Sequence, residues 1–251
     1  MLTNRRAFLA GSTAAGLMAC ASQAQAAPKP TIRAIAFDAF PIFDPRPVSA
    51  LVEQLFPGKG ADLNNSWRTR QFEYTWLRSM GGRYKDFWSV TEEALVFAAK
   101  TLQLELTAEK RVRLMQAYLE LKPWPDVAPA LASLKAAGIR LAFLSNFTPG
   151  MLNAGIKNGG LEGTFEHILS TDRAKTYKPA PHAYQMGMEA FKLRREEILF
   201  AAFAGWDAAG AKWFGYPTFW VNRLHSPAEE LDVAPDGAGA NLADLVTFVI
   251  G

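Results

Sequence analysis

The sequence predicts an α/β protein, with a Rossmann-like parallel sheet core and a helical cap domain inserted after the first strand. Short apolar runs alternate with helical patterns over most of the chain, which is typical of βαβ units. Residues 45–122 differ, because they show helical periodicity and almost no strand signal. Proline-rich stretches flank that segment on both sides. We therefore expect a core domain made of residues 30–44 and 123–251, with residues 45–122 as the cap.

Four apolar runs are the expected strands of the core. The first spans residues 32–37 and ends at Asp38, and the others span residues 140–144, 198–204 and 218–221. Each run is short and dominated by apolar residues, as expected for a strand that is covered on both faces of a sheet.

Helical patterns fill the intervals between these strands. In the core we expect helices over residues 127–137, 181–191 and 208–214. In the cap we expect helices over residues 67–80, 87–104 and 108–121. Because strand–helix–strand connections are right-handed, this order predicts a parallel sheet with helices on both faces.

The composition narrows the class of protein. The 251 residues include 27 Lys and Arg against 24 Asp and Glu, a net charge of +3 without long charge runs, which disfavours nucleic acid as a partner. With 49% hydrophobic and 20% charged residues, the chain is globular rather than disordered. Its one cysteine, Cys20, excludes both a disulfide framework and a cysteine-based zinc site within one chain.

Residues 1–26 resemble a twin-arginine (Tat-type) signal peptide. Arg5 and Arg6 precede a small apolar stretch, residues 10–19, which is shorter than the ~20 residues that a spanning helix needs. Cleavage after Ala26 would release a periplasmic protein with no stable membrane span. Lipidation of Cys20 is the alternative outcome, which would give a lipoprotein, and we favour cleavage.

Polar side chains follow the expected strands. Asp38 ends the first strand, Ser145 and Asn146 follow the second, Lys178 precedes a helix, and Asp207 follows a later strand. Each of them alone would be an ordinary cap or turn residue. In an open parallel sheet, however, ligands bind at the carboxyl ends of the strands, near the point where strand order reverses. Together these residues therefore predict a site that holds a carboxylate nucleophile and an ammonium group.

Over about residues 31–250 the chain resembles the haloacid dehalogenase superfamily and, within it, the L-2-haloacid dehalogenases of type II. The core motifs that carry the resemblance are AIAFDAF at 34–40, LSN at 144–146, YKP at 177–179 with Tyr184, WDAAGA at 206–211 and FGYPT at 214–218. The cap contributes Trp67–Arg68 and EYTWLRS at 73–79, which is more specific to this subfamily.

The resemblance implies a haloacid dehalogenase-like fold and hydrolytic dehalogenation of short-chain 2-haloacids to 2-hydroxyacids. It implies no cofactor and no metal, a small 2-haloacid as the substrate, and a homodimer built through cap helices. A phosphatase of this architecture needs an acid at the position of Phe40 to protonate its leaving group. It also needs further carboxylates near Asp207 to hold Mg²⁺, where the chain has Gly205 and Trp206. A halide leaves without a proton, so a dehalogenase needs neither.

The resemblance also implies a role for each polar residue of the site. Asp38 would attack C2 of the substrate and form an ester, which water then cleaves. Lys178 would lie close to Asp38 and favour its ionised form. Asp207 would orient Lys178 or the hydrolytic water. Ser145 and Tyr184 would hold the substrate carboxylate or Lys178.

A second group of residues would surround the halogen. Arg68, reaching in from the cap, and Asn146 would cradle the departing halide. Aromatic ring edges carry positive charge density and can help to bind an anion. The apolar wall around the halogenated carbon would consist of Phe40, Phe72, Phe87 and Trp206.

The chain departs from the family pattern beside the nucleophile and before Asp207. Pro41 and Ile42 stand where the family has Gly-Thr, so a hydroxyl that supports Asp38 or the substrate is absent. Ala202 and Ala204 replace a serine and an asparagine that place the hydrolytic water. We therefore expect either an altered substrate range or slow hydrolysis of the ester.

Two other functions remain open at this point. The chain could be a phosphatase-like hydrolase for another small substrate within the same superfamily. It could also be a catalytically impaired periplasmic binding protein on this scaffold.

Overall fold

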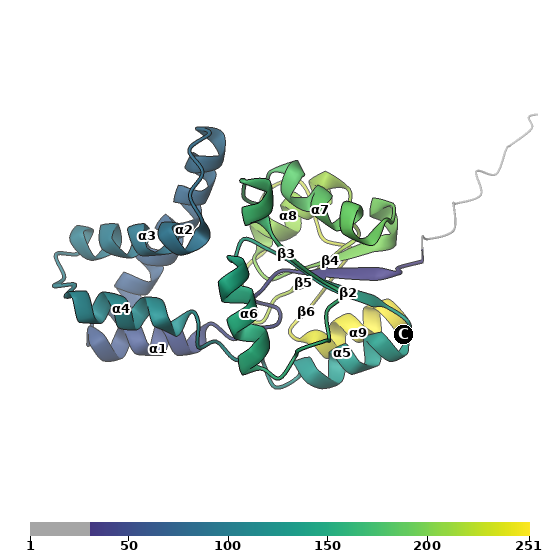
Figure 1. Ribbon diagram of the computed structural model, residues 1–251, viewed down its shortest axis with the longest axis horizontal. Helices are drawn as coiled ribbons and strands as arrows, with labels where there is room; N and C mark the ends of the chain where they lie inside the picture. Colours follow the sequence, from purple (N-terminus) through teal and green to yellow (C-terminus); the bar gives the residue numbers. More distant parts are fainter. Residues whose placement is uncertain (1–30) are drawn as a thin grey trace, which may run out of the picture.

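The computed structural model describes residues 31–251, which form a helical cap and an α/β core (Figure 1). The expected signal peptide and Cys20 lie outside the described residues. Within residues 31–251 no helix is both long enough and apolar enough to cross a membrane.

The core is a parallel sheet of six strands in the order β3-β2-β1-β4-β5-β6. The strands are β1 (Ala34–Phe37), β2 (Arg140–Ser145), β3 (His167–Ser170), β4 (Ile198–Ala202), β5 (Thr218–Val221) and β6 (Gly237–Gly239). The chain builds outward from β1 in one direction and then returns to add strands on its other side. Strand order therefore reverses between β1 and β4, and the predicted fold class is confirmed.

Helices cover both faces of the sheet (Figure 1). One face carries α5 (Val127–Ala136), α6 (Pro149–Asn158) and α9 (Leu242–Ile250), and the other carries α7 (Pro181–Phe191) and α8 (Gly205–Phe214). Alternation along β1 explains the division, because Ile35 and Phe37 point to the first face and Ala34 and Ala36 to the second. Short 3₁₀ turns precede α7 and β4.

The cap consists of α1 (Arg46–Leu55), α2 (Gly60–Met80), α3 (Phe87–Thr101) and α4 (Ala108–Ala117), all between β1 and α5. The sequence analysis missed α1 and began α2 seven residues late. The prolines that precede the cap were interpreted as the boundary between core and cap, whereas Pro47 occupies the first turn of α1. A proline is tolerated there because the first N–H groups of a helix have no partner within it.

Four elements of the core were also missed, namely α6, β3, β6 and α9. The reason is clearest for β6, whose sequence Gly-Ala-Gly carries no strand signal. It pairs with β5 at Phe219, and a Cβ on Gly237 would lie 2.7 Å from the Phe248 ring. The close packing of α9 over this strand explains the glycine at 237, and such a tertiary contact leaves no local sequence signal.

Two linkers connect the cap to the core and run side by side. Asp44 N donates to Lys122 O at 2.9 Å, and Trp124 N donates to Ile42 O at 3.0 Å. Phe43 and Pro123 form an isolated antiparallel bridge between them. The exit from β1 and the entry to α5 are therefore held together directly beneath the cap.

Candidate active site

A cavity of about 530 Å³ lies at the carboxyl ends of β1, β2 and β4, and both domains line it. This is where strand order reverses, as expected for a ligand site in such a sheet. The core lines it with Asp38, Phe40, Ser145, Asn146, Lys178, Trp206 and Asp207, and the cap with Arg68, Phe72 and Phe87. Ten of the eleven predicted site residues are thus brought together.

Asp38 follows β1 and is fixed by donors on both of its oxygens. Oδ1 accepts from Lys178 Nζ at 2.8 Å and from Ser145 Oγ at 3.2 Å. Among residues 31–251, Oδ2 accepts from a single donor, the backbone N–H of Phe40, at 3.2 Å. The side chain is 13% exposed. Because Oδ1 accepts from two donors and Oδ2 from one, Oδ2 keeps more of its charge free for a ligand.

Lys178 joins two carboxylates inside the core. Its side chain is 1% exposed, and Nζ lies 2.8 Å from Asp38 Oδ1 and 2.5 Å from Asp207 Oδ2. Burial acts to lower the pKa of Lys178, but the charges of Asp207 and Asp38 outweigh it and raise the pKa above its ordinary value. The ammonium therefore stays charged and holds both carboxylates in place.

Asp207 lies in the first turn of α8 and is almost completely buried. Burial raises the pKa of Asp207 to about 6, and the charge of Lys178 opposes this rise. Its Oδ1 accepts from Tyr184 Oη at 2.7 Å. Asp207 is thus ionised at neutral pH but much closer to protonation than an exposed aspartate.

Tyr184 is the predicted site residue that the structure does not bring to the cavity. It is fully buried, and its hydroxyl donates to Asp207 instead of facing a ligand or Lys178. The ring fits between α7 and α8 because residue 210 is glycine, where a Cβ would lie 2.6 Å from Tyr184 Oη. The expected contact of Tyr184 with substrate is therefore replaced by a contact that holds Asp207.

Asn146 has its amide oriented by two donors. Its Oδ1 accepts from the backbone N–H of Lys178 at 3.0 Å and from Thr171 Oγ1 at 3.2 Å. This leaves the NH₂ group as the end of the side chain that can donate to a ligand in the cavity. The sequence analysis did not identify Thr171, which carries no motif signal of its own.

Arg68 is the cation that the cap brings to the cavity. It lies on α2, is exposed, and has no hydrogen-bond or ion-pair partner within residues 31–251. A guanidinium without a carboxylate partner can receive an anion without first breaking an ion pair.

Aromatic rings make up most of the apolar wall. Phe72 and Trp206 pack at 5.1 Å between centroids, and Phe40 packs against Phe203 at 5.5 Å. Trp76 also lines the cavity, although it was not predicted. Its position four residues after Phe72 on α2 puts both rings on one helix face, which is the signal that could have found it.

The acidic residues of the site do not form a metal centre. Among residues 31–251 no three His, Cys, Asp or Glu side chains are grouped so that they could hold an ion. Between Asp38 and Asp207 the Lys178 ammonium occupies the place where a shared cation would bind.

The family comparisons agree on one group of proteins. Residues 20–215 match the family model of haloacid dehalogenase-like hydrolases. The chain is 43% identical to haloacetate dehalogenase H-2 of Moraxella sp. (strain B), over 82% of this chain and 92% of that protein. It is 41% identical to the (S)-2-haloacid dehalogenase of Pseudomonas sp. (strain YL), over 86% of this chain and 93% of that protein.

Solved structures are similar over the same range. A crystal structure of an L-2-haloacid dehalogenase is 45% identical, with a TM-score of 0.86, and covers 88% of this chain and 100% of its own. The L-2-haloacid dehalogenase from Xanthobacter autotrophicus, solved with chloropropionic acid covalently bound, is 36% identical, with a TM-score of 0.80. That pair covers 88% of this chain and 99% of the other.

Lys178→Met should destabilise the protein by about 3–5 kcal/mol near neutral pH, because it leaves the buried carboxylate of Asp207 and the partly buried carboxylate of Asp38 without their partner. The pKa of Asp207 then rises further, so the folded variant binds protons that the unfolded chain does not. The loss should therefore shrink as the pH falls from about 8 to about 5. Urea unfolding across that pH range measures it.

Lys212→Met is the matched control, since Lys212 and Asp236 form a partly exposed pair at 2.9 Å. It should cost less than about 1 kcal/mol. A Lys178→Met variant as stable as this control at every pH would contradict the buried ion pair.

Proposed function

The chain belongs to the haloacid dehalogenase-like hydrolases, and we propose that it hydrolyses the carbon–halogen bond of short-chain (S)-2-haloacids to give 2-hydroxyacids. The observation that carries this function is the Asp38 carboxylate, which is fixed by Lys178, Ser145 and the Phe40 N–H at the floor of an aromatic cavity. A related enzyme has been solved with chloropropionic acid covalently bound, as expected for a covalent ester route.

In the first step Asp38 Oδ2 attacks C2 of the substrate from the side opposite the halogen. The C–O bond forms as the carbon–halogen bond breaks, and the halide leaves with its electron pair. The Arg68 guanidinium and the Asn146 amide receive the halide through N–H donors. Ring edges of Phe87 and Trp206 add a weaker attraction for the anion.

In the second step water attacks Cγ of the Asp38 ester. Charge on the former carbonyl oxygen is stabilised by the Lys178 ammonium and the Ser145 hydroxyl, which already bond Oδ1. As the tetrahedral intermediate collapses, the bond from Cγ to Oδ2 breaks, and the 2-alkoxide leaves with that oxygen and takes the remaining proton of the added hydroxyl. It is released as the 2-hydroxyacid, and Asp38 is again a carboxylate. In this scheme Asp207 is the base that takes a proton from the attacking water. Its pKa of about 6 suits proton transfer near neutral pH.

The two alternatives that the sequence left open are not favoured. Phe40 cannot act as the acid that a phosphatase-like mechanism requires. A non-catalytic binding protein would have no need of an ion-paired carboxylate that opens into the cavity.

(S)-2-Chloropropionate should release chloride when incubated with the enzyme, and intact mass should show an ester on Asp38. Asp38→Asn should lower the rate by on the order of 10³ or more, because it removes the attacking oxygen. Since alanines stand at 202 and 204, we expect the ester to accumulate during turnover, and Ala202→Ser/Ala204→Asn to reduce its level. Absence of both chloride and adduct would sink the proposed activity, whereas fast turnover without accumulated ester would rule out slow hydrolysis.

We further propose that the twin arginines direct export to the periplasm. Arg5→Lys/Arg6→Lys should leave the uncleaved precursor in the cytoplasm, as measured by cell fractionation and immunoblotting, whereas Lys29→Arg should not. Cys20→Ala separates the two outcomes of export, because only a lipoprotein would move from the membrane to the soluble fraction. Unchanged periplasmic levels in the double-lysine variant would contradict the proposal.

We also propose a homodimer that forms through the α2 and α3 face of the cap. Leu77 and Met80 are 61% and 87% exposed, and they extend a stripe on α2 that begins at Tyr74. Phe97 of α3 packs against Tyr74 at 6.1 Å and widens the same apolar face. Such a face fits a second copy of itself across a two-fold axis.

Light scattering should therefore give a dimer for the wild type and a monomer for Leu77→Glu/Met80→Glu, because four buried charges would oppose pairing. Val112→Glu on α4 is the matched control, since Val112 is 64% exposed and lies on a different helix. A monomeric wild type, or a dimer that persists in the double variant, would rule out this interface.

A further inference from the structure

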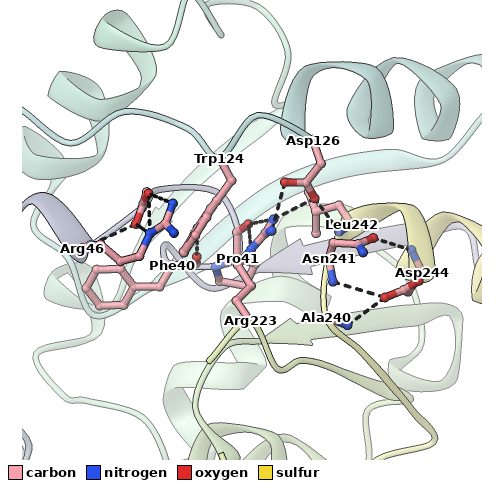
Figure 2. Close-up of polar contacts among 11 residues, drawn as sticks. Phe40, Pro41, Arg46, Trp124, Asp126, Arg223, Ala240, Asn241, Leu242 and Asp244 are labelled. Atoms are coloured by element: carbon pink, nitrogen blue, oxygen red, sulfur yellow. Dashed lines mark hydrogen bonds and ion pairs between the residues drawn. The ribbon is translucent and has the colours of Figure 1, made fainter. Parts of the chain in front are cut away.

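Two side chains, Trp124 and Arg223, bond the turn that follows Asp38, and Asp126 anchors Arg223 (Figure 2). We call Trp124, Asp126 and Arg223 the carbonyl clamp. Trp124 Nε1 donates to Phe40 O at 3.0 Å. Arg223 donates to Pro41 O from Nη2 at 2.8 Å and from Nε at 3.2 Å. The clamp thus occupies two successive carbonyl oxygens of the nucleophile turn.

The clamp is anchored in the core. Both Asp126 oxygens accept from the Arg223 guanidinium at 3.0 Å, and Oδ2 also accepts from Leu242 N at 2.7 Å, at the first residue of α9. Burial acts to raise the pKa of Asp126, but the bonds from Arg223 and Leu242 hold it below its ordinary value. The Arg223 side chain is 5% exposed, so this ion pair has little freedom to move.

The indole of Trp124 is contacted by two guanidinium groups. Arg223 lies 4.6 Å from the ring centroid and Arg46 lies 4.5 Å from it. Their hydrogen bonds differ, because the Arg46 side chain donates to Asp44 whereas Arg223 reaches the nucleophile turn. The two arginines therefore share the stacking contact but not the contact with residues 38–41.

The clamp contacts the carbonyl side of the nucleophile turn. The carbonyl oxygens of Phe40 and Pro41 are bonded to the clamp side chains, and Ile42 O accepts from Trp124 N. Phe40 N–H donates in the other direction, to Asp38 Oδ2. Pro41 has no N–H of its own, so the single bond from Phe40 is the only support that the structure shows on Oδ2.

We propose that Arg223 and Trp124 are positioning residues for the nucleophile. By holding the carbonyls of Phe40 and Pro41 they direct the Phe40 N–H at Asp38 Oδ2 and fix the angle from which that oxygen attacks. This inference rests on the proposed dehalogenation, since the effect is on formation of the Asp38 ester. Neither residue touches the substrate.

Arg223→Lys and Arg46→Lys form a matched pair. Each replaces a guanidinium that stacks on the Trp124 indole by an ammonium of the same charge. A single ammonium cannot bond the Pro41 carbonyl and both Asp126 oxygens in the geometry of the guanidinium fork. In single-turnover mass measurements Arg223→Lys should form the Asp38 ester about 10- to 100-fold more slowly, as expected for a small misplacement of the nucleophile. KM should stay within about twofold, because binding contacts are retained. Arg46→Lys should form the ester at the wild-type rate.

Trp124→Phe is the second variant, since it removes only the Nε1 bond to Phe40 O and keeps an aromatic ring. It should also slow ester formation with KM unchanged, and circular dichroism should show that it is folded. Wild-type ester rates in folded Arg223→Lys and Trp124→Phe would overturn the proposal. So would an Arg46→Lys variant as slow as Arg223→Lys, because a general loss of packing would then explain both.

Hydrogen exchange separates this inference from the proposed function. If the wild type forms no ester, the dehalogenation proposal fails, but the peptide that contains residues 38–41 still tests the clamp. Faster exchange of that peptide in Arg223→Lys than in Arg46→Lys supports the clamp, and equal exchange overturns it.

Discussion

The ammonium of Lys178, shared between Asp38 and Asp207, is the interaction on which the rest of the site depends. Two carboxylates can lie this close inside the protein only because a buried cation compensates them. The three groups come from the end of β1, the loop before α7 and the start of α8. They meet because strand order reverses between β1 and β4. The topology of the sheet therefore places the charged groups of the site beside one another.

The two domains contribute different chemistry to the cavity. The core supplies the ionic groups and the hydrogen bonds that fix them. The cap supplies apolar walls and the Arg68 cation, for which the described residues 31–251 offer no ion-pair partner. Most of this comes from α2, because Arg68, Phe72 and Trp76 follow one another at four-residue spacing. Rigid charges on the sheet and rings on the cap together make a small apolar space around a fixed carboxylate.

Main-chain groups provide support where the side chains around the nucleophile are apolar. Phe40 N–H bonds Asp38, and Phe203 and Ala204 line the same cavity with apolar side chains. The direction of a main-chain group depends on what holds its peptide, and here Trp124 and Arg223 hold it from more than 80 residues away. The reactivity of the carboxylate is thus coupled to the linker between cap and core.

The sequence by itself determined the sheet core, the inserted cap and the polar residues at the strand ends, because apolar runs, helical periods and short motifs are local patterns. It could not show that Tyr184 turns toward Asp207, that Trp76 faces the cavity, or that Gly-Ala-Gly pairs as β6. Nor could it show that Arg223 reaches Pro41. Only the tertiary structure decided these features, because each depends on which distant side chain fills the space beside it.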